Sequence, residues 1–140
     1  MDYTLSLELA LPYIAGIIDG EGCITISKRG QPLLRLSMYD REPMDIIAHT
    51  FGGSVNRMKR SDGKPVWQLT YTSQSAVDVA YTIGPWLLVK KAEADLLVEY
   101  YKDFTSYKGG DHAKIPQEEW DKRTYYYNRM QELVKGHKKR

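Results

Sequence analysis

The feature that most constrains the fold of this chain is its apolar segment 11–22, which two glycines close. Pro12 fits the first turn of a helix, because the N–H that proline lacks would have no helical partner there. We therefore expect a helix that begins near Leu11 and is ended by Gly20 and Gly22. The acidic residue between those glycines is predicted to lie just past the helix end.

Small residues on this helix predict a contact with a second helix. Ala15 and Gly16 are adjacent, and Gly20 follows Gly16 after four residues. Residues this small let two helix backbones approach closely. A single domain would leave that stripe uncovered, so an identical helix from a second copy of the chain is expected to cross it.

Beyond this helix the apolar residues recur every second position, which indicates strands. Ile24 and Ile26 alternate with polar residues, and Leu34, Leu36 and Met38 repeat the pattern. These residues are expected to face the core, while the residues between them face outward. The sequence therefore predicts two strands joined by a turn.

A second pair of strands is predicted on either side of Asp62-Gly63, a dipeptide typical of tight hairpin turns. The run after it alternates cleanly, with Trp67, Leu69 and Tyr71 on one face. The run before it, residues 54–59, alternates poorly and leaves room for a bulge.

The remaining segments are predicted to be helical. They are 41–51 with Asp40 as its cap, 73–83 capped by Ser73, a longer helix opened by Gly84-Pro85 that runs to Tyr101, and Gln117–Val134. The order is αββαββα with an additional C-terminal helix, an α+β domain with a curved antiparallel sheet. One domain is expected over residues 1–140, with its core at about 10–104 and a helical extension at about 111–136.

Residues 14–22 resemble the LAGLIDADG signature position by position. Four residues are identical to it: Ala15, Gly16, Asp19 and Gly22. Apolar or acidic character, or a common variant, is kept at Ile14, Ile17, Ile18, Gly20 and Glu21. With the matching element order, the resemblance covers about residues 10–104. The chain is similar to LAGLIDADG homing endonucleases that carry a single motif, since no second copy is visible in residues 23–140.

The resemblance implies a site-specific double-strand DNA endonuclease that acts as a homodimer on a long, roughly palindromic site. Cleavage would be metal-dependent hydrolysis that leaves 3′ overhangs. Glu21 of each chain, with Gly20, would hold the metal; Mg²⁺ is expected, and Ca²⁺ or Mn²⁺ are substitutes in binding or activity. Lys90 aligns with the family's lysine near the scissile phosphates, and Lys91 competes for that role. Asp19 would be structural rather than a ligand.

Family members place a polar residue near the end of the second strand, where it orders active-site water. Here that position falls on Met38 or Asp40, depending on one gap. Met38 cannot order water, and Asp40 is also the predicted helix cap. This departure leaves open which residue has that function.

Two further surfaces follow from the resemblance. The dimer interface would comprise Tyr13, Ala15, Gly16, Ile17, Asp19 and Gly20. DNA would be contacted by outward strand residues that can form hydrogen bonds with base edges, namely Thr25, Ser27, Arg29, Arg35, Ser37, Gln68, Thr70 and Thr72. Lys28 is also expected to bind DNA. Phosphate contacts would come from Arg57, Lys59, Arg60 and Lys64 around the hairpin.

Composition sets weaker bounds. The net charge is only +2, although basic residues gather in the middle of the chain and at its end. No apolar stretch predicts a membrane span, and the one cysteine, Cys23, suits a reducing intracellular compartment.

Two rival functions keep the same fold without cleavage: an RNA maturase and a DNA-binding regulator. Glu21 favours the nuclease, because a carboxylate that faces phosphate is costly unless a metal lies between them. Whether the gene lies in an intron or an intein, or stands alone, is left open.

Overall fold

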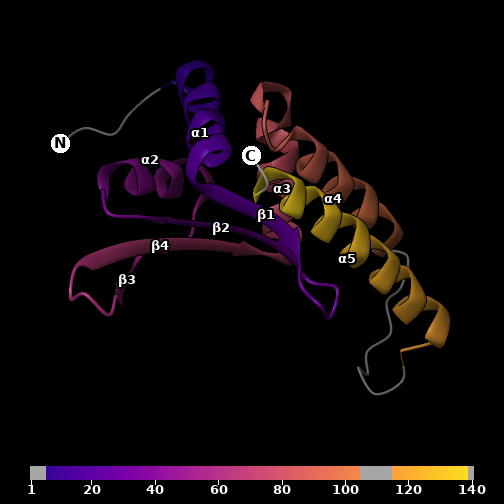
Figure 1. The fold of residues 1–140 in the computed structure, drawn as a ribbon. Helices are drawn as coiled ribbons and strands as arrows, with labels where there is room; N and C mark the ends of the chain where they lie inside the picture. Colours follow the sequence, from indigo (N-terminus) through magenta and orange to yellow (C-terminus); the bar gives the residue numbers. More distant parts are fainter. Residues whose placement is uncertain (1–5, 105–114, 139–140) are drawn as a thin grey trace.

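A computed structural model describes residues 6–104 and 115–138 of the chain. In Figure 1 the helices lie on one side of a four-stranded antiparallel sheet, and among these residues nothing covers the other face. The elements are α1 (Leu7–Glu21), β1 (Gly22–Ile26), β2 (Pro32–Met38), α2 (Glu42–Phe51), β3 (Asn56–Lys59), β4 (Pro65–Thr72), α3 (Ser73–Ile83), the 3₁₀ turn η1 (Gly84–Trp86), α4 (Lys91–Phe104) and α5 (Gln117–Lys138). The predicted αββαββα order with a further C-terminal helix is confirmed.

The sheet order is β1-β2-β4-β3, and every pair is antiparallel. The alternating apolar residues of the sequence are the buried residues of the strands. Ile24, Ile26, Leu34 and Leu36 are buried, while Arg35, which lies between Leu34 and Leu36, is exposed. The pairing of β3 with β4 is continuous from Asn56 to Lys59, so the expected bulge is absent from that ladder. The irregular part of segment 54–59 simply precedes the strand.

The motif helix is longer than its sequence suggests. It begins at Leu7, so Pro12 lies inside it rather than in its first turn, and the predicted start at Leu11 is wrong. Gly20 and Glu21 continue the helix, which ends where Gly22 adopts extended backbone at φ −89° and ψ 169°. Glycine therefore permits the turn into β1 without a left-handed conformation.

Three other helix starts differ from expectation. Arg41, not Asp40, is the cap residue of α2, and its side chain stacks on Trp67, 4.6 Å from the ring centroid. Ser73 is the first residue of α3 rather than its cap, with φ of 53°. The long helix expected from Gly84 is broken into η1, an irregular segment 87–90 and α4.

One apolar core lies between the sheet and the helices, built around fully buried residues such as Ile14, Leu36 and Leu97. The helix α5 joins this core through Tyr126 and Met130 and runs beside α4 (Figure 1). Burying this apolar area is the main stabilising term. One face of the sheet is thereby committed to the core.

Candidate nucleic-acid interface and acidic site

The C-terminal end of α1 is tied to the segment that precedes α4. The Asp19 carboxylate accepts the backbone N–H of Leu88 at 2.8 Å and that of Lys90 at 3.0 Å. In return, the Lys90 ammonium donates to the Asp19 carbonyl oxygen at 2.6 Å. A cation at this helix end is also favoured by the helix dipole. These three bonds hold the two helix ends together, and backbone donors use both Asp19 carboxylate oxygens.

Glu21 is the last residue of α1 rather than a residue beyond it. Its side chain is exposed, and within residues 6–104 and 115–138 its carboxylate has no hydrogen-bond or ion-pair partner. Gly20 beside it is exposed too, and a Cβ added there would meet nothing within 4 Å. The chain therefore presents an unpaired carboxylate where the motif helix passes into β1.

Of the two candidate lysines, only Lys90 contacts the motif. Lys91 instead forms an exposed ion pair with Asp95 at 2.9 Å. Lys90 is half-buried, and an ammonium has three N–H donors, so its bond to Asp19 leaves capacity for a phosphate. Lys90 is therefore held against the end of the motif helix, whereas Lys91 is paired along α4.

The donor set at this end of α1 is made of oxygen. In the part of the chain that the structure describes, no group of three or more His, Cys, Asp or Glu residues could hold a metal alone. One chain supplies the Glu21 carboxylate, with the Gly20 carbonyl next to it. Such oxygens are the ligands that Mg²⁺ and Ca²⁺ prefer. These residues therefore fit a hard divalent cation whose other ligands come from outside this chain.

The outer face of α1 exposes a stripe at helical spacing. Leu9 is 64% exposed and Tyr13 42%, and Gly16 and Gly20 continue the same line. A Cβ on Gly16 would meet nothing within 4 Å. Glycine inside a helix costs about 1 kcal/mol relative to alanine, and no contact within the described residues explains that cost. Ile17 and Asp19 lie at its margin, each half-buried.

Ala15 is a correction to the predicted interface. Its side chain is 0% exposed and belongs to the core beside Ile14 and Ile18. The adjacency of Ala15 and Gly16 in sequence hid the fact that neighbouring helix positions point about 100° apart. Leu9, which sequence reasoning missed, takes its place on the exposed side.

The open face of the sheet carries the predicted base-reading residues in rows that cross the strands. The pairing places Cys23, Arg35 and Thr70 in one row, Thr25, Leu33 and Thr72 in the next, and Ser37, Gln68 and Asn56 in a third. Arg35 has an exposed side chain without a hydrogen-bond or ion-pair partner among the described residues. Leu33 and Asn56 were not among the predicted contacts. Alternation with Leu34 already puts Leu33 on this face, whereas only the register assigns Asn56 to it.

The same register moves two basic residues off this face. Arg57 pairs with Trp67, and Lys59 pairs with Pro65, so both lie on the side that faces the helices. Their placement suits the rim of a DNA contact rather than a groove. Arg60 and Lys64 lie in the exposed turn beyond β3.

At the other end of the sheet, the β1–β2 turn presents Lys28 and Arg29, both exposed. Ser27 is used within that turn, because its hydroxyl accepts the N–H of Gln31 at 2.9 Å. The two positions considered for ordering water differ as well: Met38 packs on the core, and Asp40 is exposed. Met38 is therefore unsuited to that role.

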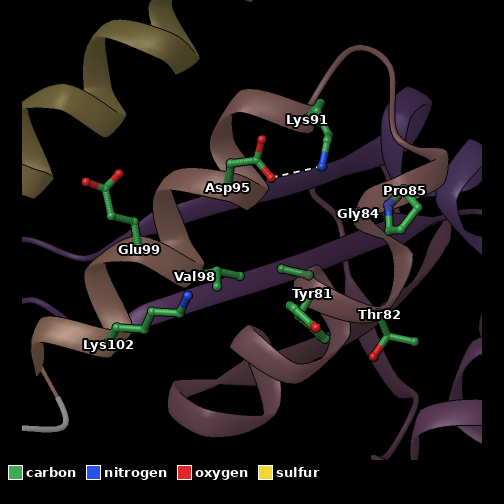
Figure 2. Close-up of a pocket in the computed structure, with 10 residues that line it drawn as sticks. Tyr81, Thr82, Gly84, Pro85, Lys91, Asp95, Val98, Glu99 and Lys102 are labelled. Atoms are coloured by element: carbon green, nitrogen blue, oxygen red, sulfur yellow. Dashed lines mark hydrogen bonds and ion pairs between the residues drawn. The ribbon is translucent and has the colours of Figure 1, made fainter.

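A hollow of about 600 Å³ lies between α3 and α4 (Figure 2). Tyr81 and Thr82 border it from α3, and the Lys91–Asp95 pair and Lys102 border it from α4. Of the residues considered for the site, Lys91 alone borders this hollow, and Glu21 and Lys90 do not. Among the described helices none is both long and apolar enough to cross a membrane.

Comparison with known proteins identifies the family and the fold of the chain. The model of the LAGLIDADG-like domain matches residues 8–84. The homing endonuclease I-CvuI in complex with its target has a TM-score of 0.69 and 20% identity, over 90% of this chain and 82% of that one. I-CeuI complexed with DNA has a TM-score of 0.59 and 14% identity, over 75% of this chain and 59% of that one.

The meganuclease I-AabMI bound to uncleaved DNA has a TM-score of 0.62 and 18% identity, and the match covers 84% of this chain and 43% of that one. No curated protein matches the chain. At these identities the solved structures establish the fold. Because the family model also spans more than half of the chain, this protein belongs to the LAGLIDADG-like domain family and has the fold of the LAGLIDADG homing endonucleases.

Proposed function

We propose that the chain is one subunit of a divalent-metal-dependent endonuclease that cuts both strands of a specific DNA site. The observation that carries the proposal is the exposed, unpaired Glu21 carboxylate at the end of the motif helix. An exposed carboxylate close to a DNA-binding surface would by itself repel DNA phosphate. A metal ion between the two would turn that repulsion into attraction.

The open sheet face is the proposed DNA contact. Its central row contains Arg35, whose guanidinium can donate two hydrogen bonds to the major-groove edge of guanine. Lys28 and Arg29 extend the basic surface at one end, and Arg60 and Lys64 extend it at the other. The relatives I-CvuI and I-CeuI were solved with DNA, which supports a DNA partner for this chain.

A second copy of the chain is the proposed partner of the α1 stripe. The chain contains one motif and therefore one Glu21, whereas cutting two strands needs two such sites. Gly16 and Gly20 would let the two motif helices approach backbone to backbone, and Tyr13 would pack at the crossing. Such a two-fold dimer implies a roughly palindromic DNA site. Cleavage by the family's arrangement would leave 3′ overhangs.

Within the site each residue has a separate role. Glu21 and the Gly20 carbonyl would hold the cation, with Mg²⁺ as the expected ion and Ca²⁺ or Mn²⁺ as substitutes. A bound cation there would neutralise phosphate charge and lower the pKa of water for attack. Asp19 fixes the end of α1 through the Leu88 and Lys90 amides. The Lys90 ammonium lies at that end, where it could also stabilise charge that develops on phosphate.

Cleavage of a randomised duplex library in Mg²⁺, followed by sequencing of the cut ends, would first identify the target. On that target Glu21→Gln should reduce cleavage by more than about 100-fold, beyond the loss typical of groups that only support a metal ligand. The substitution keeps the side chain's shape but removes its charge. DNA binding in chelator should survive or tighten, because one repulsive carboxylate is lost from each scissile phosphate.

Glu8→Gln is the matched control, since Glu8 is exposed at the opposite end of the same helix. It should cleave at the wild-type rate. Sedimentation of the wild type should give a dimer. Cleavage by Glu21→Gln within a few-fold of wild type would remove Glu21 as the ligand. Selective DNA binding without any wild-type cleavage would instead favour a DNA-binding regulator, and RNA binding without DNA selection would favour a maturase.

A further inference from the structure

The turn between β1 and β2 is held from behind by two side chains that lie far away in sequence. The Tyr100 hydroxyl donates to the Gly30 carbonyl oxygen at 2.5 Å, and the Arg123 guanidinium donates to the Arg29 carbonyl oxygen at 3.3 Å. Tyr100 belongs to α4 and Arg123 to α5. Two helices therefore fasten the backbone of a single five-residue turn, residues 27–31.

Both fastening groups are buried. Tyr100 is 0% exposed and Arg123 8%. Glu119, also buried, accepts from the Arg123 Nε at 3.3 Å and from the Lys122 Nζ at 2.9 Å. A buried guanidinium is costly unless it is paired and hydrogen-bonded, and here Glu119 and the turn carbonyl supply those partners. The paired charges of α5 thus include one group, the Arg123 guanidinium, that bonds the backbone of the turn.

The turn is shaped to accept these groups. Gly30 has φ of +92°, a conformation that residues with a Cβ rarely adopt. A Cβ there would approach the Tyr100 hydroxyl oxygen to 2.6 Å and the Arg123 Cδ to 2.7 Å. The fit requires glycine for its backbone angle and also for its space.

The front of the same turn carries charge that nothing in the described residues neutralises. Lys28 and Arg29 are exposed, and neither side chain makes a hydrogen bond or ion pair there. Ser27 and Gln31 close the turn, since the Ser27 N–H donates to the Gln31 carbonyl at 2.8 Å. The helices thus fix the backbone of the turn, while its two basic side chains are exposed to solvent.

We infer that α4 and α5 form a brace that presents Lys28 and Arg29 to DNA in a preset position, with Tyr100 and Arg123 as its positioning residues. This inference rests on the proposed function. It adds that the base pairs within reach of the β1–β2 turn are read by a rigid contact. A mobile turn would lose conformational entropy when it binds DNA. A turn that is already fixed avoids this cost. The brace thereby sharpens discrimination at the base pairs that this turn reaches.

Two tyrosine variants test the brace with the same chemical change. Tyr100→Phe removes the hydroxyl that holds the turn. Tyr126→Phe is the matched control, because its hydroxyl donates at 2.7 Å to Asp103 across the same α4–α5 contact and away from the turn. Base pairs within reach of the turn are first defined with Lys28→Ala and Arg29→Ala on a panel of single-base-pair target variants.

Tyr100→Phe should lower discrimination at those base pairs by about three- to tenfold, the scale of one hydrogen bond, and leave the Arg35 positions unchanged. Hydrogen–deuterium exchange of amides 27–31 in the free protein should quicken in the same variant. Tyr126→Phe should change neither readout. If Tyr100→Phe fails to fold, Arg123→Lys takes its place, because an ammonium keeps the charge but not the planar fork of donors.

Equal profiles for the two tyrosine variants, or a loss spread over all base pairs, would overturn the brace. If the wild type selects no DNA at all, the readout role and the proposed function fail together. The exchange measurement separates these cases, since it tests the fastening of the turn without DNA.

Discussion

The two hairpin turns at opposite ends of the sheet are built in opposite ways (Figure 1). The β1–β2 turn is fastened by the buried Tyr100 and Arg123. No described residue supports the β3–β4 turn in this way. All four β3 residues are exposed, and the Gly63 N–H closes the turn on the Arg60 carbonyl oxygen at 3.0 Å. Among the described residues, its side-chain link beyond the hairpin joins Arg60 to Tyr39, both largely exposed.

This contrast shows that similar turns on one sheet can differ in rigidity because of what lies behind them. Buried hydrogen bonds keep one turn in a single position, whereas exposed contacts open at little cost. In a DNA complex the braced end would set the register of the sheet. The unsupported end could adjust to the phosphate backbone.

The largest effect should come from adding one methyl group to each turn. Gly30→Ala should lower the free energy of unfolding by about 3 kcal/mol or more, because both its φ of +92° and its contacts with Tyr100 exclude a Cβ. Gly63→Ala should cost only about 1–2 kcal/mol, because φ of +80° is strained but the space around it is open. Urea unfolding of both variants measures the difference. Equal losses would mean that the brace contributes no packing.

A smaller difference in stability is expected between the loss of one arginine at each turn. Arg123→Ala should destabilise the fold by about 2–3 kcal/mol, because it leaves Glu119 buried with Lys122 as its remaining cation. Arg60→Ala should cost less than about 1 kcal/mol, since its pair with Asp62 at 3.8 Å is exposed. Thermal unfolding compares the two. A cost for Arg60→Ala as large as that for Arg123→Ala would erase the distinction between the turns.

The smallest effect is confined to high pH. Burial raises the pKa of Tyr100 to about 12 from its ordinary 10.0. The unfolded chain therefore releases this proton first as the pH rises, so the stability that the buried hydroxyl contributes is complete below pH 10 and is lost between about pH 10 and 12. The loss from one such group is at most about 1.4 kcal/mol per pH unit.

Urea unfolding at pH 9, 10 and 11 measures this slope, and Tyr100→Phe should make it shallower. Tyr71→Phe should do the same, because burial also raises the pKa of Tyr71 to about 12. Its hydroxyl donates to the Gly52 carbonyl oxygen at 2.8 Å, a contact separate from the brace. An unchanged slope in Tyr100→Phe would mean that its hydroxyl is not protected in the native state.

Short sequence patterns correctly predicted those structural features that depend only on residues close together in the chain. Alternation at Ile24, Arg35 and Leu36 assigned the faces of the sheet, because strand side chains alternate whatever lies around them. The motif likewise placed Glu21 within one residue of its true position, since it was expected just past the helix and is the last residue of α1. What failed depends on distant residues: the helix expected from Gly84 is interrupted because Asp19 takes the Leu88 and Lys90 amides that a continuous helix would have used itself.

The same limit applies at the proposed site. Arg57 was predicted among the charges around the hairpin, and only its pairing with Trp67 reveals the face of the sheet on which it lies. Ala15 could not be assigned to the core from the motif, since either side of a small-residue stripe could be buried. The brace was invisible, because its partners, Gly30 and Tyr100, lie 70 residues apart.

The bonds of Asp19 to Leu88 and Lys90 span 69 and 71 residues. During synthesis the whole motif therefore leaves the ribosome long before the residues that fix its end. A nascent chain that stops short of residue 88 contains Glu21 but cannot hold it in its final place, because contacts between distant residues form only after both have been made. The acidic end of the motif helix is thus completed late, when the sheet that would lie against DNA already has all four of its strands.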